Sequence, residues 1–184
     1  MTTKHKEYAS ALKVLFMKDW TEMSHRSLGD CWVVLMQSDN PQERWLATYA
    51  NLVGDRRLFN TMPSANIQFI IDGLDRGLPT QTLDKVTELM GLNRQSMSQV
   101  LDVSQRTLSR RHTLETATSE RLFRVVALFQ KALQVLGERD EARRWFTTAK
   151  KALGGKTPLE FSETEVGARE VEDLLGRIEY GVYA

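Results

Sequence analysis

The segment RQSMSQVLDVSQRTLSRR, residues 94–111, is the most informative part of this 184-residue chain for its fold class. It predicts two short helices joined by a tight turn at residues 102–104, with Ser104 capping the second helix. Its apolar side chains are spaced to pack the two helices together at a steep angle, as in a helix-turn-helix. These side chains are Met97, Val100, Leu101, Val103 and Leu108.

The second helix of this motif presents a polar and basic face. A recognition helix places its N-terminal residues in the major groove, so base contacts are expected from the first residues and phosphate contacts from the arginines that follow. The alternative is a helix-turn-helix kept only as a scaffold, with its arginines solvated. The predicted DNA-binding set is Gln105, Arg106 and Thr107 for bases, Arg110 and Arg111 for phosphates, and Ser109 beside them.

Two positions depart from the usual helix-turn-helix pattern. The turn position that usually holds glycine is Asp102. Aspartate tolerates the left-handed conformation better than most residues, so the turn is expected to form. Ser98 replaces the small alanine common on the first helix, which is a mild steric change.

The remainder of the chain also reads as helix, so we expect an all-α fold. Apolar residues recur at helical spacing in several further segments, each bounded by a glycine or a capping residue. A strand is an alternative for NIQFII, residues 66–71, but its neighbours favour a helix that carries the apolar stripe Ile67, Ile70, Ile71 and Leu74 and ends at Gly77. The other expected helices are 80–90, 119–136, one around Trp145 and Phe146, a short one capped by Thr157-Pro158, and one capped by Thr164.

These segments predict three parts along the chain. Residues 1–60 form an N-terminal helical extension, in which Trp45, Tyr49, Leu52 and Val53 point inward, and residues 55–63 read as a linker. Residues 64–118 form the helix-turn-helix domain, and residues 119–184 form a C-terminal helical domain. The role of residues 1–60 does not follow from the sequence.

Composition excludes several classes of protein. No run approaches eighteen consecutive apolar residues, and the first ten residues lack the apolar core of a signal peptide, so we expect a cytoplasmic protein. Cys31 is the one cysteine, expected as a buried thiol in a reducing compartment. His5, His25 and His112 are dispersed, and no metal-ligand spacing or nucleotide-binding motif is present. We therefore expect neither an enzyme nor a cofactor.

Charge is distributed unevenly although the net charge is only +1. Residues 139–156 carry six basic side chains against two acids, whereas residues 157–184 carry two arginines against seven acids. One interpretation is that the charged residues of both segments lie on solvated helix faces. The functional interpretation is that the acidic C-terminal segment complements a basic partner and speeds encounter.

The C-terminal helix is followed by an aromatic segment. Val171, Leu174, Leu175 and Ile178 form one apolar stripe, after which Tyr180 and Tyr183 have no evident core to fill. Tyrosine is favoured at interfaces, so these side chains are candidate partner contacts. The alternative is that both tyrosines fold back onto their own domain.

The same C-terminal stretch resembles a known family. The motifs are GGKTPLE at 154–160, TE-x-GA at 164–168 and VE-x-LLGRIEYGV at 171–182, with TLSRR at 107–111 in support. In order and spacing they are similar to the Xre/MbcA/ParS antitoxins, over roughly residues 67–184. The resemblance implies a RES-domain toxin partner that consumes NAD, whose active site the C-terminal region closes. The implied toxin-binding residues are Arg169, Glu172, Arg177, Glu179, Tyr180, Val182 and Tyr183.

The expected function is therefore a type II antitoxin that binds its toxin and, as a homodimer, represses its own operon by binding operator DNA. The alternative is a stand-alone helix-turn-helix regulator whose C-terminal domain only dimerises. A neighbouring reading frame that encodes a RES domain distinguishes the two.

Overall fold

The computed structural model describes residues 48, 49, 52 and 67–181, all within the second of two compact units, Met36–Ala184. The secondary structure of these residues is helical, which confirms the all-α prediction, and an isolated antiparallel bridge joins Pro79 and Thr113. Residues 67–76 form a helix and not the strand that was the alternative. The helices are α5 (Ile67–Arg76), α6 (Gln81–Met90), α7 (Arg94–Val100), α8 (Gln105–Arg110), α9 (Thr116–Leu136), α10 (Arg139–Thr147), the 3-10 turn η2 (Lys151–Leu153), α11 (Pro158–Phe161) and α12 (Glu165–Glu179).

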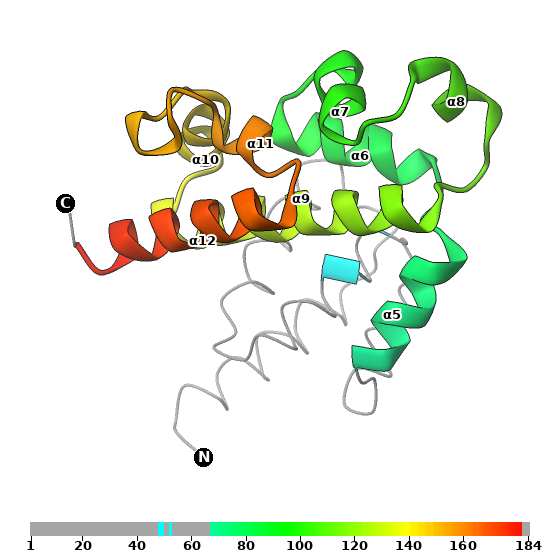
Figure 1. Ribbon diagram of the computed structural model, residues 1–184, viewed down its shortest axis with the longest axis horizontal. Coiled ribbons are helices and arrows are strands. Elements are labelled where there is room, and N and C mark those ends of the chain that lie inside the picture. Colours follow the sequence, from blue (N-terminus) through cyan, green and yellow to red (C-terminus); the bar gives the residue numbers. More distant parts are fainter. Residues whose placement is uncertain (1–47, 50–51, 53–66, 182–184) are drawn as a thin grey trace, which may run out of the picture. The chain divides into compact units, whose positions relative to one another are not determined.

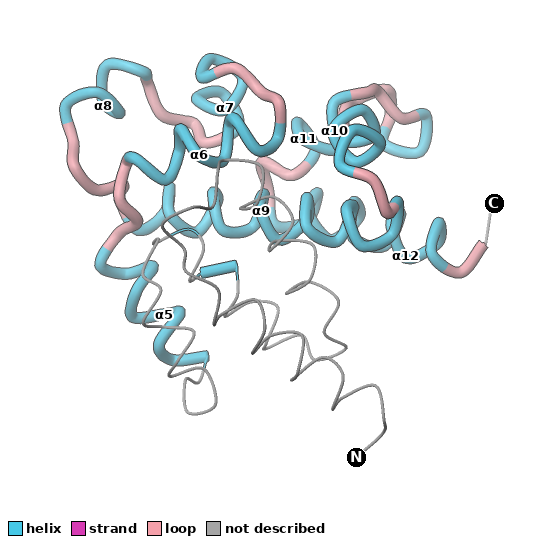
Figure 2. The backbone as a smooth tube through the Cα atoms, turned by 180° about the vertical axis from the view of Figure 1, so that it is seen from behind, coloured by secondary structure: helices cyan, strands magenta, loops and turns pink. Residues whose placement is uncertain are grey.

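Helix α9 runs through the middle of this unit, as Figures 1 and 2 show from opposite sides. It begins at Thr116, three residues before the predicted start at Ser119, and ends as predicted at Gly137. Its apolar side chains are buried along most of its length, including Leu122, Val125 and Phe129, which are fully inaccessible to solvent. The helix crosses the predicted domain boundary at residues 118–119, so both halves pack on one element.

The N-terminal part of α9 supports the helix-turn-helix half through polar contacts with the main chain. The Ser119 hydroxyl accepts a hydrogen bond from the Leu78 amide at 2.9 Å, and the Thr116 hydroxyl donates to the Asp75 carbonyl at 3.1 Å. Arg121 donates to the Leu101 carbonyl at 3.0 Å. These bonds satisfy main-chain groups at the ends of α5 and α7, which lack partners within their own helices.

The C-terminal part of α9 carries the other half, in which α10 and α12 both pack on it. Phe129 of α9 meets Phe146 of α10 edge to face, with ring centroids 5.6 Å apart. Val171 and Leu175 bury the inner face of α12, as its apolar stripe predicts. Two ion pairs join α12 to α9: Arg124–Glu165 at 3.0 Å lies at the start of α12, and Lys131–Glu179 lies at its end.

The connections of this half are held by local capping. Thr157 and Glu160 form a capping box at the start of α11, as the Thr157-Pro158 pattern predicts. Hydrogen bonds from Thr157 lower the pKa of Glu160. The Thr164 hydroxyl accepts from the Gly167 amide at 3.1 Å and caps α12 as expected. Local sequence therefore sets where α11 and α12 begin.

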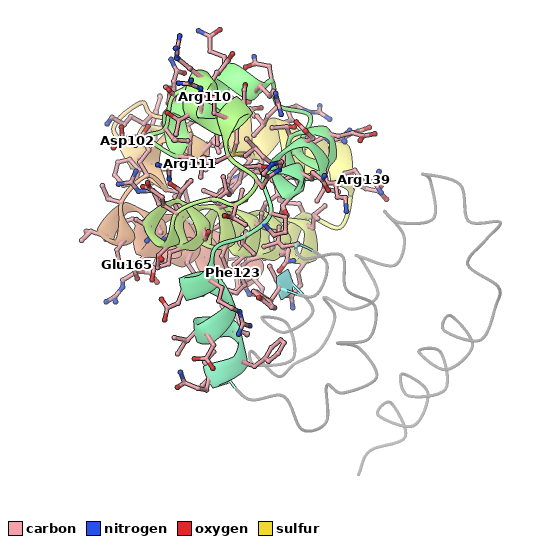
Figure 3. The ribbon with its side chains drawn as sticks, turned by 90° about the vertical axis from the view of Figure 1, so that its right-hand side faces the viewer. Asp102, Arg110, Arg111, Phe123, Arg139 and Glu165 are labelled. Atoms are coloured by element: carbon pink, nitrogen blue, oxygen red, sulfur yellow. The ribbon has the colours of Figure 1, made fainter. Side chains whose placement is uncertain are left out.

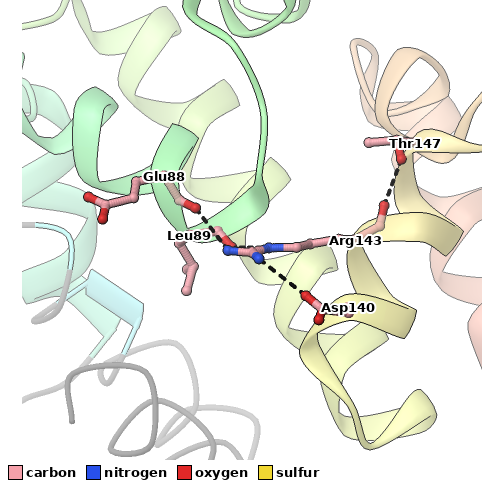
Figure 4. Close-up of polar contacts among 5 residues, drawn as sticks. All are labelled: Glu88, Leu89, Asp140, Arg143 and Thr147. Atoms are coloured by element: carbon pink, nitrogen blue, oxygen red, sulfur yellow. Dashed lines mark hydrogen bonds and ion pairs between the residues drawn. The ribbon is translucent and has the colours of Figure 1, made fainter. Parts of the chain in front are cut away.

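Arg143 of α10 links the two halves directly (Figure 4). Its guanidinium donates to the carbonyls of Leu89 at 2.9 Å and Glu88 at 3.0 Å, in the last turn of α6, and contacts Asp140 at 3.2 Å. Gly91 ends α6 with φ of 65°, and a Cβ there would lie 3.2 Å from the Arg143 side chain. Arg143 therefore acts as a C-cap for a helix 54 residues away along the sequence.

Two details of the predicted core are wrong. In α5 the expected inward stripe included Ile67 and Ile71, but these are 37% and 44% exposed, whereas Ile70 and Leu74 are buried. Ile70 and Leu74 lie one turn apart on the buried side of α5, which packs on α9, whereas Ile67 and Ile71 lie one turn apart beside them on the exposed side. Tyr49 and Leu52 are buried as expected, and the rest of the predicted N-terminal extension lies outside the described residues.

We expect the Arg143→Ala variant to lose about 2 kcal/mol of unfolding free energy, because charge-assisted hydrogen bonds to two carbonyls are removed. The matched control is Arg144→Ala, since Arg144 is exposed and pairs only with Glu141 across the helix surface. That control is expected to change stability by less than about 0.5 kcal/mol. Urea unfolding at pH 7 measures both, and equal losses would contradict the linking role of Arg143.

Candidate functional site

The predicted helix-turn-helix forms from α7 and α8. Met97, Val100, Leu101 and Leu108 are buried, as the spacing predicts, while Val103 is half-buried. Asp102 takes the left-handed conformation with φ of 53°, among the described residues the one non-glycine to do so. Its carboxylate lies 3.4 Å from Arg121 of α9. This ion pair adds to the tolerance of aspartate for the turn, and the turn forms without glycine.

Three of the predicted DNA-binding residues project freely from α8. Gln105, Arg106 and Arg110 are exposed, and none of their side chains forms a hydrogen bond or ion pair with another residue that the structure describes. Figure 3 looks onto this end of the unit, with Arg110 labelled on the outer side of α8. Free guanidinium and amide groups on one short helix are suited to phosphates and base edges.

The other three predicted residues are engaged within the chain. The Thr107 hydroxyl shares a hydrogen bond of 2.8 Å with Ser104, which itself caps α8 through the Thr107 amide. Ser109 donates to the Gln105 carbonyl at 2.8 Å, one turn earlier. Arg111 lies beyond the helix end and is paired with Glu115. To contact a ligand, these three side chains would have to break or share the hydrogen bonds and the ion pair that they form within the chain.

The far end of the unit presents a second exposed group. Tyr180 follows the last turn of α12 and is 80% exposed. Its amide donates to the Gly176 carbonyl at 3.0 Å, and Gly181 closes the helix with φ of 66°. Tyr180 therefore does not fold back onto its own domain, which was the alternative for this side chain. Val182 and Tyr183 lie outside the described residues.

The remaining predicted partner contacts lie along α12. Glu172 and Arg177 are exposed, and Arg169 is exposed with a 3.4 Å ion pair to Glu165 on the same helix. Glu179 is held by Lys131 of α9, which anchors the helix end. Val166, 74% exposed near the start of α12, was not selected from the sequence. The sequence could have indicated Val166, because it lies fourteen residues before Tyr180 and fourteen residues return a helix to nearly the same face.

The basic segment 139–156 is not one uniform surface. Arg143 is committed to the end of α6, and Arg144 is paired with Glu141. The Lys150 ammonium lies 5.4 Å from the centre of the Trp145 ring, and burial lowers its pKa. Arg143 and Lys150 therefore contribute to packing within the chain, and Arg144 is paired at the surface. The number of basic residues alone overstates the unpaired positive charge of this segment.

The described part of the chain contains neither a metal-binding cluster nor a membrane-spanning helix. Among residues 48, 49, 52 and 67–181, no three histidine, cysteine, aspartate or glutamate side chains come together as a metal site. Across the same residues, no helix is both long and apolar enough to cross a bilayer.

Comparisons with known proteins match both halves. The family described as the antitoxin Xre-like helix-turn-helix domain matches residues 70–127, and the antitoxin Xre/MbcA/ParS C-terminal toxin-binding domain matches residues 131–181. An antitoxin Xre of Yersinia enterocolitica is 29% identical over 128 residues, 67% of this chain and 86% of the relative. Relatives of the same name from Photorhabdus laumondii and Pseudomonas putida are 30% and 32% identical, over 59% and 57% of this chain and 77% and 67% of their own lengths.

The chain belongs to the Xre antitoxin family. Membership confirms the resemblance seen in the sequence and identifies the chain as a regulatory binding protein rather than an enzyme. Neither domain match includes residues 1–69, so the N-terminal extension predicted for this Xre antitoxin lies outside both. The three-part division of the chain stays a prediction.

The two exposed groups of this Xre antitoxin lie at opposite ends of α9. Helix α8 lies beside the N-terminal end of α9, and the end of α12 lies beside its C-terminal end, as both views of the backbone show.

The turn of the helix-turn-helix generates a stability prediction. Asp102→Gly is expected to unfold at nearly the native urea concentration, because glycine adopts positive φ without strain and offsets the lost Arg121 pair. Asp102→Ala is expected to lose about 1 kcal/mol, since alanine has neither advantage. Equal stability of the glycine and alanine variants would show that φ at residue 102 does not limit the fold.

Proposed function

We propose that this chain is the antitoxin of a type II pair whose toxin is a RES-domain enzyme that consumes NAD. The observation that carries the proposal is Tyr180, an exposed aromatic side chain held at the rigid end of α12, within the part that matches a toxin-binding domain. The RES partner itself is implied by the sequence motifs at residues 154–182.

The proposed inhibition is occlusion of the toxin's active site. Tyr180, Val182 and Tyr183 would enter the mouth of the NAD pocket, with Arg177 one turn earlier. Tyrosine stacks where a nicotinamide or adenine ring would bind, and arginine meets phosphate-binding or acidic groups. Because α12 is capped at both ends and packed on α9, little ordering free energy would be spent when the toxin binds. Arg169, Glu172 and Glu179 would lie at the rim of the contact.

The second proposed activity is repression of the chain's own operon. Helix α8 would enter the major groove, with Gln105, Arg106 and Thr107 toward bases and Arg110 and Arg111 toward phosphates. Ser109 would lie beside them. A homodimer in the cytoplasm would place two such helices on half-sites about one helical turn apart.

The salt dependence of operator binding tests the DNA surface. Arg110 and Arg111 from two protomers allow about four phosphate contacts, so log affinity should fall with log salt at a slope of about −4. Replacing Arg110 and Arg111 with alanine should weaken binding to all sequences and remove most of this slope. Glu115→Gln releases Arg111 from its ion pair and should strengthen binding.

Arg144→Ala is the matched control, because Arg144 is an exposed arginine in the other half of the chain. Gel-shift titrations at several salt concentrations measure all four proteins. Unchanged operator affinity after the double substitution would show that α8 is not the DNA surface.

The C-terminal segment is tested by removing residues 180–184, which leaves α12 and its Lys131–Glu179 pair intact. The truncated chain should fail to rescue growth of cells that express the toxin, while it still binds operator DNA. Tyr180→Ala should weaken toxin binding by about 30-fold, the size expected for a buried aromatic anchor. Tyr180→Phe keeps the ring and serves as the control.

Full neutralisation by the truncated chain would place the inhibitory contact elsewhere. Loss of both activities together would indicate a structural role for the segment. If the native chain binds operator DNA but neutralises no RES toxin encoded beside it, the chain is a stand-alone regulator whose C-terminal domain dimerises.

A further inference from the structure

Helix α12 contains one glycine that its own fold does not require. Gly176 lies inside the helix, where glycine is less favourable than alanine. A Cβ added at Gly176 would have no atom within 4 Å, so no neighbour in the chain demands the small residue. Its φ is not positive, so the backbone does not demand it either.

The other described glycines are explained by the structure. A Cβ at Gly73 would lie 1.7 Å from the Tyr49 hydroxyl, and one at Gly167 would lie 1.9 Å from the Phe161 carbonyl oxygen. The remaining ones take positive φ at turns and helix ends, where L side chains are strained: Gly77, Gly91, Gly137, Gly154, Gly155 and Gly181. Gly176 alone among them is unexplained by the isolated chain.

Gly176 lies on the outer face of α12, which we name the α12 stripe: Val166, Asp173, Gly176 and Tyr180. Val166, Asp173 and Tyr180 are seven residues apart and so share one face, and Gly176 lies one turn from both Asp173 and Tyr180. Val171 and Leu175 face the opposite way, into the core. The stripe is thus an exposed face with large apolar groups near its two ends and an open glycine between them.

We infer that the toxin's main chain packs against the α12 stripe, with Gly176 as the point of closest approach. A missing side chain lets a partner backbone reach the helix, which is the usual reason for glycine at such a contact. On this inference the toxin presents apolar pockets for Val166 and Tyr180, which are 74% and 80% exposed in the free chain. The exposed carboxylate of Asp173 would accept a main-chain amide, and the exposed Arg177 would donate to a main-chain carbonyl.

The occupant is the toxin because the α12 stripe lies wholly within residues 131–181, which match the toxin-binding domain, and is continuous with Tyr180. The inference rests on the proposed function for the identity of this partner. It goes beyond that proposal because it extends the contact from the end of the chain to a whole helix face, and it assigns a specificity-determining role to a residue without a side chain.

The test uses the full chain, its purified toxin, and the variants Gly176→Ala and Gly176→Leu. Both variants should melt at or above the native temperature, because alanine and leucine favour the helix and the site is open. Toxin affinity measured by calorimetry should fall roughly tenfold or more for alanine and further for leucine, as overpacking of a close contact predicts. Operator affinity should not change.

The control is Ala117→Leu, which adds bulk at an exposed position of α9 outside residues 131–181 and should leave toxin affinity unchanged. If the native chain binds the toxin and Gly176→Leu binds equally tightly, the inference is overturned and the proposed function stands. If the native chain does not bind the toxin, the proposed function fails first. If Gly176→Leu changes only the mass measured by light scattering, the stripe faces a second copy, which also overturns the inference.

Discussion

The structure depends on the burial of α9 from two sides. Helix α9 packs against α5 and α6 of the helix-turn-helix half and against α10 and α12 of the other half, with Leu122, Val125 and Phe129 fully buried along the way. The described unit is therefore expected to unfold as one cooperative body, because the loss of α9 removes the packing surface of both halves.

Much of this architecture could be predicted because it is set by local signals. Ser104, Thr157 and Thr164 each cap the helix that the sequence assigns to them, and Asp102 adopts the positive φ that the turn requires. The first residue of α9 was harder to predict from the sequence. Its N-cap residue, Glu115, forms no side-chain capping bond, so no sequence signal marks the first turn.

The site was predicted less completely, for a physical reason. Residue type indicates what a side chain can bind, but not whether the fold already uses it. Arg110 and Arg111 are adjacent in the run TLSRR, yet Arg111 is paired with Glu115 whereas Arg110 forms no ion pair with a residue that the structure describes. Arg143 reads as surface charge, yet it contacts carbonyls 54 residues away in sequence. Long-range contacts of this kind depend on tertiary packing, which periodicity does not reveal.

The contacts that join the two halves share one further property. The side chains of Ser119, Thr116, Arg121 and Arg143 all bond to main-chain groups of the half that contains the helix-turn-helix, at Leu78, Asp75, Leu101, Glu88 and Leu89. A main-chain amide or carbonyl is present whatever side chain a position carries. Side chains on the exposed helices can therefore diverge without disturbing the support beneath them. On the proposed function, a lineage of such chains is free to acquire a new operator sequence while the proposed toxin surface keeps its geometry.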